Sequence, residues 1–216
     1  MTVENSSTAP VILSVRDLDV KFNLRGRVLS AIRGISLDLY QGESLAIVGE
    51  SGSGKSVFTK TFMGLLDQNG VISGGSILYN GQDLAAFRTE KQWRSIRGRE
   101  IAMVLQDPMT SLNPLKTVGS QIGEAIAIHQ GLRGAALRAK VLECLSDVGI
   151  PDPEHRYKQY PHEFSGGMRQ RVVIAIAVAC RPKILICDEP TTALDVTIQA
   201  QILDLLKRLK KKYDLT

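Results

Sequence analysis

The first third of the chain alternates apolar and polar residues, a pattern typical of half-exposed β-strands. This alternation predicts strands at 11–23, 35–40 and 76–79, each bounded by residues that favour turns. Because antiparallel sheets commonly cover a core with only one face, these strands predict an antiparallel β subdomain. Residues 1–10 are mostly polar or small, so we expect them to be disordered.

Short continuous apolar runs form a second pattern. Runs at 44–48, 101–105 and 183–187 predict strands that are buried on both faces. A helical segment without prolines, 57–66, follows the first of these runs, and a long apolar helix, 166–180, precedes the last. Buried strands that alternate with helices predict an α/β core around a parallel sheet.

Helical periodicity dominates the middle of the chain. Residues 118–129 and 135–148 predict amphipathic helices. Two prolines exclude a helix at 107–114 and predict a loop there. The predicted organisation is therefore a disordered start at 1–10, a core that includes the β subdomain at 11–105 and 164–216, and a helical subdomain at 106–163.

Two further helices have informative features. Residues 90–99 predict a basic surface helix with Trp93 half-buried. Asp195 is placed to cap the start of a final helix with its carboxylate. One apolar stripe of that helix is expected to face the core: Ile198, Ile202, Leu205, Leu206 and Leu209.

The composition is that of a globular protein, with 216 residues, 44% hydrophobic residues and a formal net charge of +5. No apolar run approaches the roughly 18 residues of a membrane span, and no secretory signal precedes the first strand, so we expect a cytoplasmic chain. The basic run 207–212 predicts a solvated helix face, with nucleic-acid or lipid contact as the alternative. Cys144, Cys180 and Cys187 lack metal-ligand spacing, so we expect buried, reduced thiols.

Between the run at 44–48 and the helix at 57–66 lies a sequence that fits the phosphate-loop pattern G-x-x-x-x-G-K-[ST]. It consists of Gly49, Glu50, Ser51, Gly52, Ser53, Gly54, Lys55 and Ser56. Glycines let backbone N–H groups turn inward onto phosphate oxygens, and the following helix points its positive dipole end there. The pattern predicts that Lys55 contacts the β- and γ-phosphates and that Ser56 holds Mg²⁺. A glycine-rich turn without a ligand is the alternative.

Two carboxylates follow directly after the apolar run 183–187. Because ligands gather at the carboxyl ends of strands in α/β folds, we expect Asp188 beside the phosphate loop, where it would support Mg²⁺. Glu189 would then be placed to orient and deprotonate the water that attacks the γ-phosphate. Two surface acids without a role are the alternative.

Ser165, Gly166 and Gly167 stand at the start of the helix predicted for 166–180. A serine at the N-cap and two small residues leave backbone N–H groups accessible, which predicts a second anion site. Considered alone, the same residues would favour a flexible helix cap without a ligand.

The order of these motifs resembles the nucleotide-binding subunit of ATP-binding cassette (ABC) transporters over about residues 15–210. The phosphate loop is followed by Gln106 after a strand, by Phe-Ser-Gly-Gly-Met-Arg-Gln-Arg at 164–171, and then by the acid pair and Asp195. Segments 106–114, 160–164 and 188–197 are similar to the branch of oligopeptide, dipeptide and nickel importers. The resemblance implies an α/β fold: a P-loop (RecA-like) nucleotide-binding core with an antiparallel β subdomain and an α-helical subdomain.

The resemblance also implies ATP and Mg²⁺ as cofactors and a role for each matching residue. Phe22 would stack on adenine, and Gln106 would sense Mg²⁺ and the γ-phosphate as part of the catalytic machinery. Asp188 would be the acid on the magnesium side, and Glu189 the general base. Contacts to ATP held by a second subunit would come from Ser165, Gly166 and Gly167, with Asp195 coupling the two sites.

The implied function is that of an ATP-binding and hydrolysing subunit that energises a bacterial importer of peptides or related small solutes. Such a subunit lies peripherally on the cytoplasmic face of the inner membrane. It pairs head to tail with a second ATPase subunit, a homologous chain or itself, contacts integral permease subunits, and is served indirectly by a periplasmic or extracellular binding protein. Nucleic acid is not an expected partner.

Two other classes share parts of the pattern. Soluble ABC-type ATPases of DNA repair or translation have the same motifs but usually insert coiled coils, zinc modules or a second cassette. Phosphate-loop kinases of small molecules lack the Ser-Gly-Gly helix start. The family's switch histidine follows the final helix, whereas His129, His155 and His162 all precede the acid pair. We therefore expect a fragment with little ATPase activity by itself.

Overall fold

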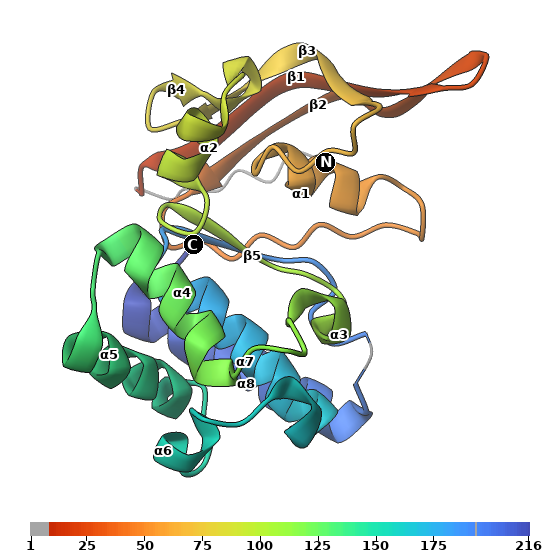
Figure 1. Cartoon of the computed structure of the whole chain (residues 1–216). Coiled ribbons are helices and arrows are strands. Elements are labelled where there is room, and N and C mark those ends of the chain that lie inside the picture. The colour runs from red at the N-terminus through yellow and green to blue at the C-terminus, as the bar shows by residue number, and fades with distance from the viewer. Residues whose placement is uncertain (1–8, 193) are drawn as a thin grey trace. The chain divides into compact units, whose positions relative to one another are not determined.

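The computed structural model describes residues 9–192 and 194–216 (Figure 1), so the disorder expected for 1–10 falls almost entirely outside the described residues. Internal contacts divide the chain into two compact units. The first unit ends at Ser95 and includes Thr216, and the second is Ile96–Leu215. The domain boundaries expected from the sequence remain a prediction.

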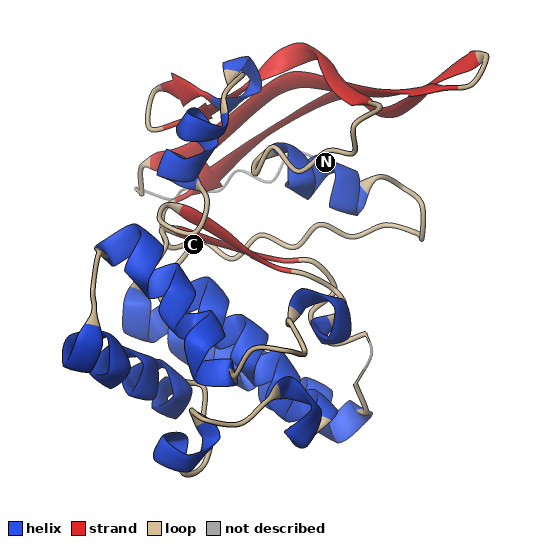
Figure 2. Ribbon diagram, in the orientation of Figure 1, coloured by secondary structure: helices blue, strands red, loops and turns tan. Residues whose placement is uncertain are grey.

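A four-stranded antiparallel sheet is the largest element of the first unit (Figure 2). Its strands are β1 (Val11–Leu24), β2 (Arg27–Tyr40), β3 (Gly70–Tyr79) and β4 (Gln82–Asp83), in the order β2-β1-β3-β4. The predicted alternation is confirmed in two parts of β1, where Leu13 and Val15 and then Leu18 and Val20 are buried, and a register shift between Val15 and Leu18 changes its phase. β1 matches its predicted range within one residue, whereas β2 and β3 begin at Arg27 and Gly70, earlier than the predicted starts at 35 and 76.

One irregularity in this sheet bears on the site. Val20 of β1 pairs with Ile32, and the next residue, Lys21, pairs with Ser30. Ala31 is therefore an extra residue in β2, a β-bulge. Bulges of this kind change the direction of the local backbone and are frequent beside functional sites.

The apolar run 44–48 does not form the buried strand that was expected. Within the described residues it joins neither sheet, and Leu45, Ile47 and Val48 are 46%, 40% and 88% exposed. An apolar run indicates a tendency to be buried, but a strand forms only where a neighbouring strand pairs with its backbone. The prediction of this strand was wrong for the structure described here.

The helix after the phosphate loop, α1 (Lys55–Thr61), begins two residues earlier than expected and ends five residues sooner. The chain then turns at Gly64, whose φ is +58°. The ring of Trp93 occupies the space beside Gly64, where a Cβ would lie 2.2 Å from Trp93 Cε2. Trp93 belongs to α2 (Glu90–Ile96) and is half-buried as predicted, with Phe87 edge-on at 5.1 Å. The short η1 (Leu84–Ala86) precedes α2.

The second unit is built on two parallel strands and a group of helices (Figures 1 and 2). The strands are β5 (Ile101–Val104) and β6 (Ile184–Cys187), paired in register from Ile101 with Ile184 to Val104 with Cys187. The helices are α3 (Pro108–Ser111), α4 (Val118–Gln130), α5 (Gly134–Asp147), α6 (Pro153–Arg156), η2 (Pro161–Glu163), α7 (Gly166–Val178) and α8 (Val196–Tyr213). The predicted helices at 118–129, 135–148 and 166–180 are therefore confirmed within a few residues.

The expectation of a loop without a helix at 107–114 was wrong, because α3 forms one turn there. Proline is tolerated in the first turn of a helix, where its missing N–H would have no intrahelical partner. Pro108 occupies the first position of α3, so only the second proline acts as a helix breaker. The short α6 was not expected either, and it also begins with a proline, Pro153.

Helix α7 lies at the centre of the second unit and packs against α3, α4, α5, α8 and β5. Its residues Val172, Ile174 and Ala175 are fully buried in the core of this unit. The predicted stripe of α8 is confirmed, since Ile202, Leu205 and Leu209 are buried and Ile198 and Leu206 pack against the same core. Among the described residues, no helix has both the length and the apolar character needed to cross a bilayer.

Candidate functional site

The phosphate loop has a backbone that only glycine adopts readily at two positions. Gly52 and Gly54 have φ values of +79° and +95°, and Gly54 is the N-cap of α1. The Lys55 ammonium donates hydrogen bonds to the carbonyl oxygens of Gly49 at 2.8 Å and Glu50 at 2.9 Å. The lysine thus lies along its own loop, where its positive charge is available to anionic oxygens.

The loop is supported by the bulge in β2. A Cβ on Gly54 would lie 3.0 Å from the carbonyl oxygen of Ala31 and 3.0 Å from Ile32 Cδ1. The extra residue of the bulge therefore contacts the last glycine of the loop. Because a side chain at position 54 would have to displace backbone, both the φ value and the space at this position require glycine.

Phe22 lies on the same strand pair as this bulge. It pairs with Leu29 of β2, two residues along the strand from Ala31, and with Gly70 of β3 on its other side. Its ring is half-buried. Phe22 and the phosphate loop are thus positioned by neighbouring parts of one sheet in the first unit.

The ends of β5 and β6 bring Gln106 and Glu189 together. Because the two strands are parallel and in register, the residues that follow them emerge at the same edge of the sheet. Gln106 Nε2 donates a hydrogen bond to Glu189 Oε2 at 2.9 Å. The two residues expected to take part in catalysis therefore contact each other directly.

A third residue, Thr192, belongs to this group and was not identified from the sequence. Its hydroxyl donates a second hydrogen bond to Glu189 Oε2 at 3.0 Å. Glu189 has a φ of +48°, and the backbone N–H of Thr192 donates to the Glu189 carbonyl at 3.3 Å, so a turn returns the threonine to the carboxylate. The only sequence signal was a hydroxyl residue three positions after the acid.

Asp188 continues the pairing of the two strands, since its backbone N–H donates to the Val104 carbonyl at 2.9 Å. It is half-buried, whereas Glu189 is exposed. Burial raises the pKa of the preceding thiol, Cys187, to about 12, so this side chain remains neutral beside the acid pair. All three cysteines are free, with Cys144 buried and Cys180 and Cys187 half-buried.

The starts of α7 and α8 form a separate group in the second unit. The Ser165 hydroxyl accepts a hydrogen bond from the Met168 N–H at 3.4 Å, and Asp195 accepts from the Ile198 N–H at 3.1 Å. Both residues are therefore N-caps, as predicted for Asp195. A Cβ on Gly167 would lie 2.7 Å from Ile198 Cγ2, so the two helix starts are in contact.

The predicted site residues therefore fall into groups by unit. The phosphate loop and Phe22 belong to the first unit, whereas Gln106, Asp188, Glu189, the Ser165 helix start and Asp195 belong to the second. The expectation that the acid pair lies beside the phosphate loop remains a prediction, and so does each residue's individual role.

Comparison with known proteins agrees with the order of these groups along the chain. Residues 32–192 match the ABC transporter family model. An oligopeptide transport ATP-binding protein, AmiE of Streptococcus pneumoniae, is 60% identical over 206 residues, which are 95% of this chain and 58% of AmiE. The dipeptide transport ATP-binding protein DppD of Escherichia coli is 53% identical over 201 residues, covering 93% of this chain and 61% of DppD.

Solved structures show the same fold. The ATP-binding cassette MJ0796, in a dimeric post-hydrolysis state bound to ADP and Pi, has a TM-score of 0.80 at 27% identity, covering 93% of this chain and 83% of that one. The structure of cbiO1 from Clostridium perfringens, part of the ABC transporter complex cbiONQ, has a TM-score of 0.78 at 30% identity, covering 95% and 76%. The chain spans less than two thirds of AmiE and DppD. On the family match, the motifs and the fold, this chain belongs to the ABC transporter family.

Proposed function

We propose that this chain is the ATP-binding and ATP-hydrolysing subunit of a bacterial ABC importer of oligopeptides or dipeptides. The observation that carries the hydrolytic part is the hydrogen bond between Gln106 and Glu189 at the carboxyl ends of two parallel strands, in a chain with a complete phosphate loop. The transported class is supported by the names of relatives that are 53% to 60% identical.

The phosphate loop supplies the binding part of this function. Lys55 would exchange its hydrogen bonds to the Gly49 and Glu50 carbonyls for bonds to the β- and γ-phosphate oxygens. The backbone turns at Gly52 and Gly54 allow N–H groups to point into the loop. Phe22, on the strand beside the bulge that supports this loop, would stack on the adenine ring.

The residues assigned to Mg²⁺ fit that ion chemically. Ser56, Gln106 and Asp188 offer a hydroxyl, an amide oxygen and a carboxylate, the hard oxygen ligands that Mg²⁺ accepts directly or through water. Bound Mg²⁺ supplies neutralisation of the charge that develops on the β- and γ-phosphates.

Glu189 would act as the general base for hydrolysis. Its carboxylate accepts two hydrogen bonds, from Gln106 and Thr192, which orient one oxygen and leave the other available to a water molecule. A proton would pass from the attacking water to this carboxylate as the water oxygen bonds to the γ-phosphorus, while the bond from that phosphorus to the β–γ bridging oxygen breaks and ADP leaves. Gln106 would orient the same water with its amide group.

We also propose that two ATPase subunits pair and share the bound ATP. Ser165, Gly166 and Gly167 would bind the γ-phosphate of ATP held by a second ATPase subunit, arranged head to tail, and Asp195 would couple the two sites. The accessible start of α7 and the dimeric state of MJ0796 support this arrangement. The partner subunit is a second copy or a homologous chain.

The complex would lie on the cytoplasmic face of the inner membrane, contact integral permease subunits, and receive its solute from a binding protein.

The expected test is a pair of substitutions in the assembled transporter. Glu189→Gln should retain ATP binding and lower the hydrolysis rate by about 100-fold or more, because the general base is lost. Glu154→Gln is the matched control, since Glu154 is exposed on α6 and paired with Arg138. An unchanged hydrolysis rate in Glu189→Gln would remove Glu189 from this role.

ATP binding is tested separately at the phosphate loop. Lys55→Ala should abolish tight ATP binding, measured by calorimetry, because the charge that faces the phosphates is lost. Lys60→Ala is the control on the same helix, and it should bind ATP normally. AmiE and DppD are both named as transport ATP-binding proteins, which favours transport over a role in DNA repair or translation.

A further inference from the structure

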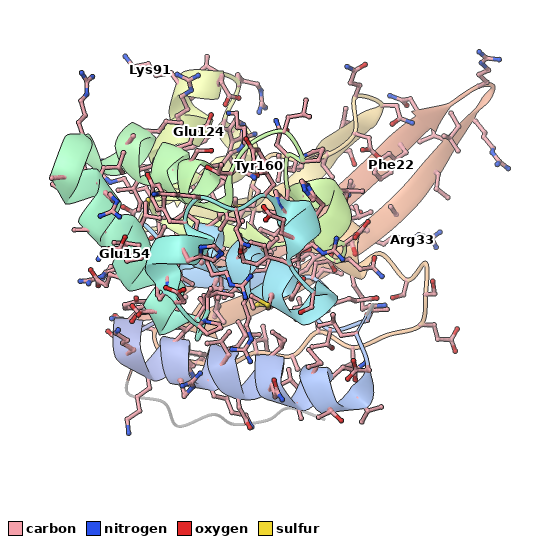
Figure 3. All side chains as sticks on the ribbon, turned by 60° about the horizontal axis from the view of Figure 1, so that its bottom comes forward. Phe22, Arg33, Lys91, Glu124, Glu154 and Tyr160 are labelled. Carbon is pink, nitrogen blue, oxygen red and sulfur yellow. The ribbon has the colours of Figure 1, made fainter. Side chains whose placement is uncertain are left out.

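The ring of Phe22 rests on the backbone of Gly70. The two residues pair across β1 and β3, and a Cβ on Gly70 would lie 2.7 Å from Phe22 Cε1 and 3.2 Å from Cδ1. These distances place one edge of the ring in the space that a side chain at position 70 would occupy. Figure 3 labels Phe22 on the long strands near the start of the chain, where β1 pairs with β2.

The backbone conformation does not explain why position 70 is a glycine. Gly70 does not have a positive φ, unlike Gly52, Gly54 and Gly64. An L-amino acid could therefore adopt the same backbone angles without strain. What excludes a side chain is the space that the Phe22 ring occupies, together with the Asp67 carbonyl oxygen, 3.2 Å from the same Cβ position.

Hydrogen bonds fix the turn that carries Gly70 to the strand that carries Phe22. The Gly70 N–H donates to the Asp67 carbonyl at 2.8 Å and closes the turn. The Asn23 N–H donates to the Asn69 carbonyl at 2.8 Å, and Asn69 Nδ2 donates to the Asn23 carbonyl at 3.3 Å. The residue after Phe22 is thus hydrogen-bonded to the residue before Gly70, so the strand that carries the ring is tied to the turn beneath it.

This turn also lies directly downstream of the phosphate loop. The chain passes from the loop through α1 and reaches the turn at Asp67 within the first unit. On the other side of Phe22, the bulge at Ala31 contacts Gly54 of the loop. Phe22 is therefore connected to the phosphate loop both by the sheet and by the segment that follows α1.

We propose that Gly70 is a positioning residue for the base of the bound nucleotide, because its missing side chain lets the Phe22 ring lie flat enough to stack on that base. The inference rests on the proposed function, in which Phe22 is the platform for adenine. Aromatic stacking requires the two rings to be parallel and close, so a small tilt of Phe22 reduces the contact. Lys55 makes its hydrogen bonds to the Gly49 and Glu50 carbonyls and not to the turn at Gly70, so we expect its contacts with phosphate to be unaffected by a change at position 70.

The test compares two glycines of the same strand. Gly70→Ala introduces a methyl group 2.7 Å from the Phe22 ring, whereas Gly74→Ala introduces one no closer than 3.4 Å to its nearest neighbour, Asp19 Oδ2. Gly74 also lacks a positive φ, so the two substitutions differ mainly in their effect on Phe22. Binding of ATP and of inorganic tripolyphosphate to each purified protein is measured by calorimetry.

Gly70→Ala should raise the Kd for ATP by about fivefold or more and leave the Kd for tripolyphosphate unchanged. Loss of one aromatic–base stack corresponds to a loss of affinity of roughly 5- to 150-fold, which sets the upper limit for this variant. Gly74→Ala should bind both ligands as the unchanged protein does. Equal weakening of both ligands by Gly70→Ala, or normal ATP binding, would overturn the inference.

A double substitution shows whether the ring transmits the effect. Phe22→Ala should weaken ATP binding, and adding Gly70→Ala to it should produce no further loss, since the ring is already absent. If Gly70→Ala alone does not fold, the double variant should recover a folded protein, because the closest clash is removed. A double variant that stays unfolded, or that loses further affinity for ATP, contradicts the inference.

The same measurements separate this inference from the proposed function. The proposed function fails if the protein without substitutions does not bind ATP, or if Lys55→Ala binds ATP normally. Failure of the inference alone appears as ATP binding that depends on Lys55 and Phe22 but is the same in Gly70→Ala and Gly74→Ala.

Discussion

At the scale of single residues, the candidate site depends on how one carboxylate is held. Glu189 Oε2 accepts hydrogen bonds from Gln106 at 2.9 Å and from Thr192 at 3.0 Å. Glu189 also has a φ of +48°, a conformation that a residue with a side chain adopts only at some cost in free energy. The backbone and the two donors together determine where the carboxylate points.

This arrangement predicts a distinct effect for Thr192→Val, which keeps the shape of the side chain and removes the hydroxyl. The rate of ATP hydrolysis should fall by roughly 2- to 10-fold while the Kd for ATP is unchanged, because only the orientation of Glu189 is affected. Thr191→Val is the matched control at the adjacent position. A parallel rise in the Kd for ATP would show that Thr192 serves binding instead.

The sequence predicted some of these residues and missed others for a physical reason. Gln106 and Glu189 follow apolar runs that end in polar residues, a pattern visible in a single sequence. The contribution of Thr192 depends on a turn that brings its hydroxyl back to the acid, and any nearby hydroxyl residue would look the same. Asn69-Gly70 resembles an ordinary turn pair, although a Cβ at position 70 would lie 2.7 Å from Phe22 Cε1.

At the scale of elements, the contact between the starts of α7 and α8 predicts different outcomes for two adjacent glycines. A Cβ at position 167 would lie 2.7 Å from Ile198 Cγ2, whereas one at position 166 would lie 3.8 Å from Leu194 Cδ2. Gly167→Ala should therefore lower the free energy of unfolding by about 1 kcal/mol or more, because Ile198 must move. Gly166→Ala should be neutral or slightly stabilising, because alanine restricts the unfolded chain.

Urea unfolding without nucleotide measures this pair, so the proposed contact with ATP does not enter. The two variants are compared at one temperature, and the slope of the transition is checked to be the same. Equal stability of Gly166→Ala and Gly167→Ala would mean that the start of α8 does not pack against α7 in solution.

A second element-scale prediction concerns the carboxyl-terminal end of α8, which is bound to α5. Asp147 accepts hydrogen bonds from Lys212 and from the Tyr213 hydroxyl. Burial by itself would raise the pKa of Asp147, but these two hydrogen bonds outweigh it and lower the pKa below its ordinary value. Lys140, which pairs with Glu143 on the same helix, acts on Asp147 in the same direction.

Because the pKa of Asp147 is lower in the folded than in the unfolded chain, ionised Asp147 contributes stability above the ordinary carboxyl pKa. This contribution disappears as the pH falls through the folded pKa. Asp147→Asn should therefore be less stable than the unchanged protein at pH 7, and the difference should narrow toward about pH 3. Asp204→Asn is the control, since Asp204 is largely exposed and pairs only with Lys207 on the same helix. A difference that does not change with pH would exclude this role for Asp147.

Long helices could be predicted from the local sequence, whereas a one-turn helix and the pairing of a strand could not. The helices at 118–130 and 134–147 are long enough for a repeating apolar face, and they were predicted within a few residues. A single turn such as α3 has no such repeat, and a proline in its first position looks like a helix breaker. The run at 44–48 is apolar enough to be buried, but its pairing depends on contacts that are distant in sequence.

At the scale of the whole molecule, the residues assigned to one ligand come from two units. The phosphate loop and Phe22 lie in the first, and Gln106, Asp188 and Glu189 lie in the second. The chain has one tryptophan, Trp93, which packs on Gly64 in the first unit. Tryptophan fluorescence therefore reports unfolding of the first unit, whereas the far-ultraviolet circular dichroism of α4, α5, α7 and α8 reports mainly the second.

A ligand that uses residues of both units must stabilise both. At about 100 times its Kd, ATP with Mg²⁺ should add about 2.7 kcal/mol to the free energy of unfolding, because it binds the folded chain and not the unfolded one. We expect the fluorescence and circular dichroism transitions to move together to higher temperature with ATP and Mg²⁺, and neither to move in Lys55→Ala. In Asp188→Asn, only the fluorescence transition should still respond, since the phosphate loop is intact while the acid side is weakened. A shift confined to fluorescence in the unchanged protein would instead mean that the acid pair does not reach the nucleotide within this chain.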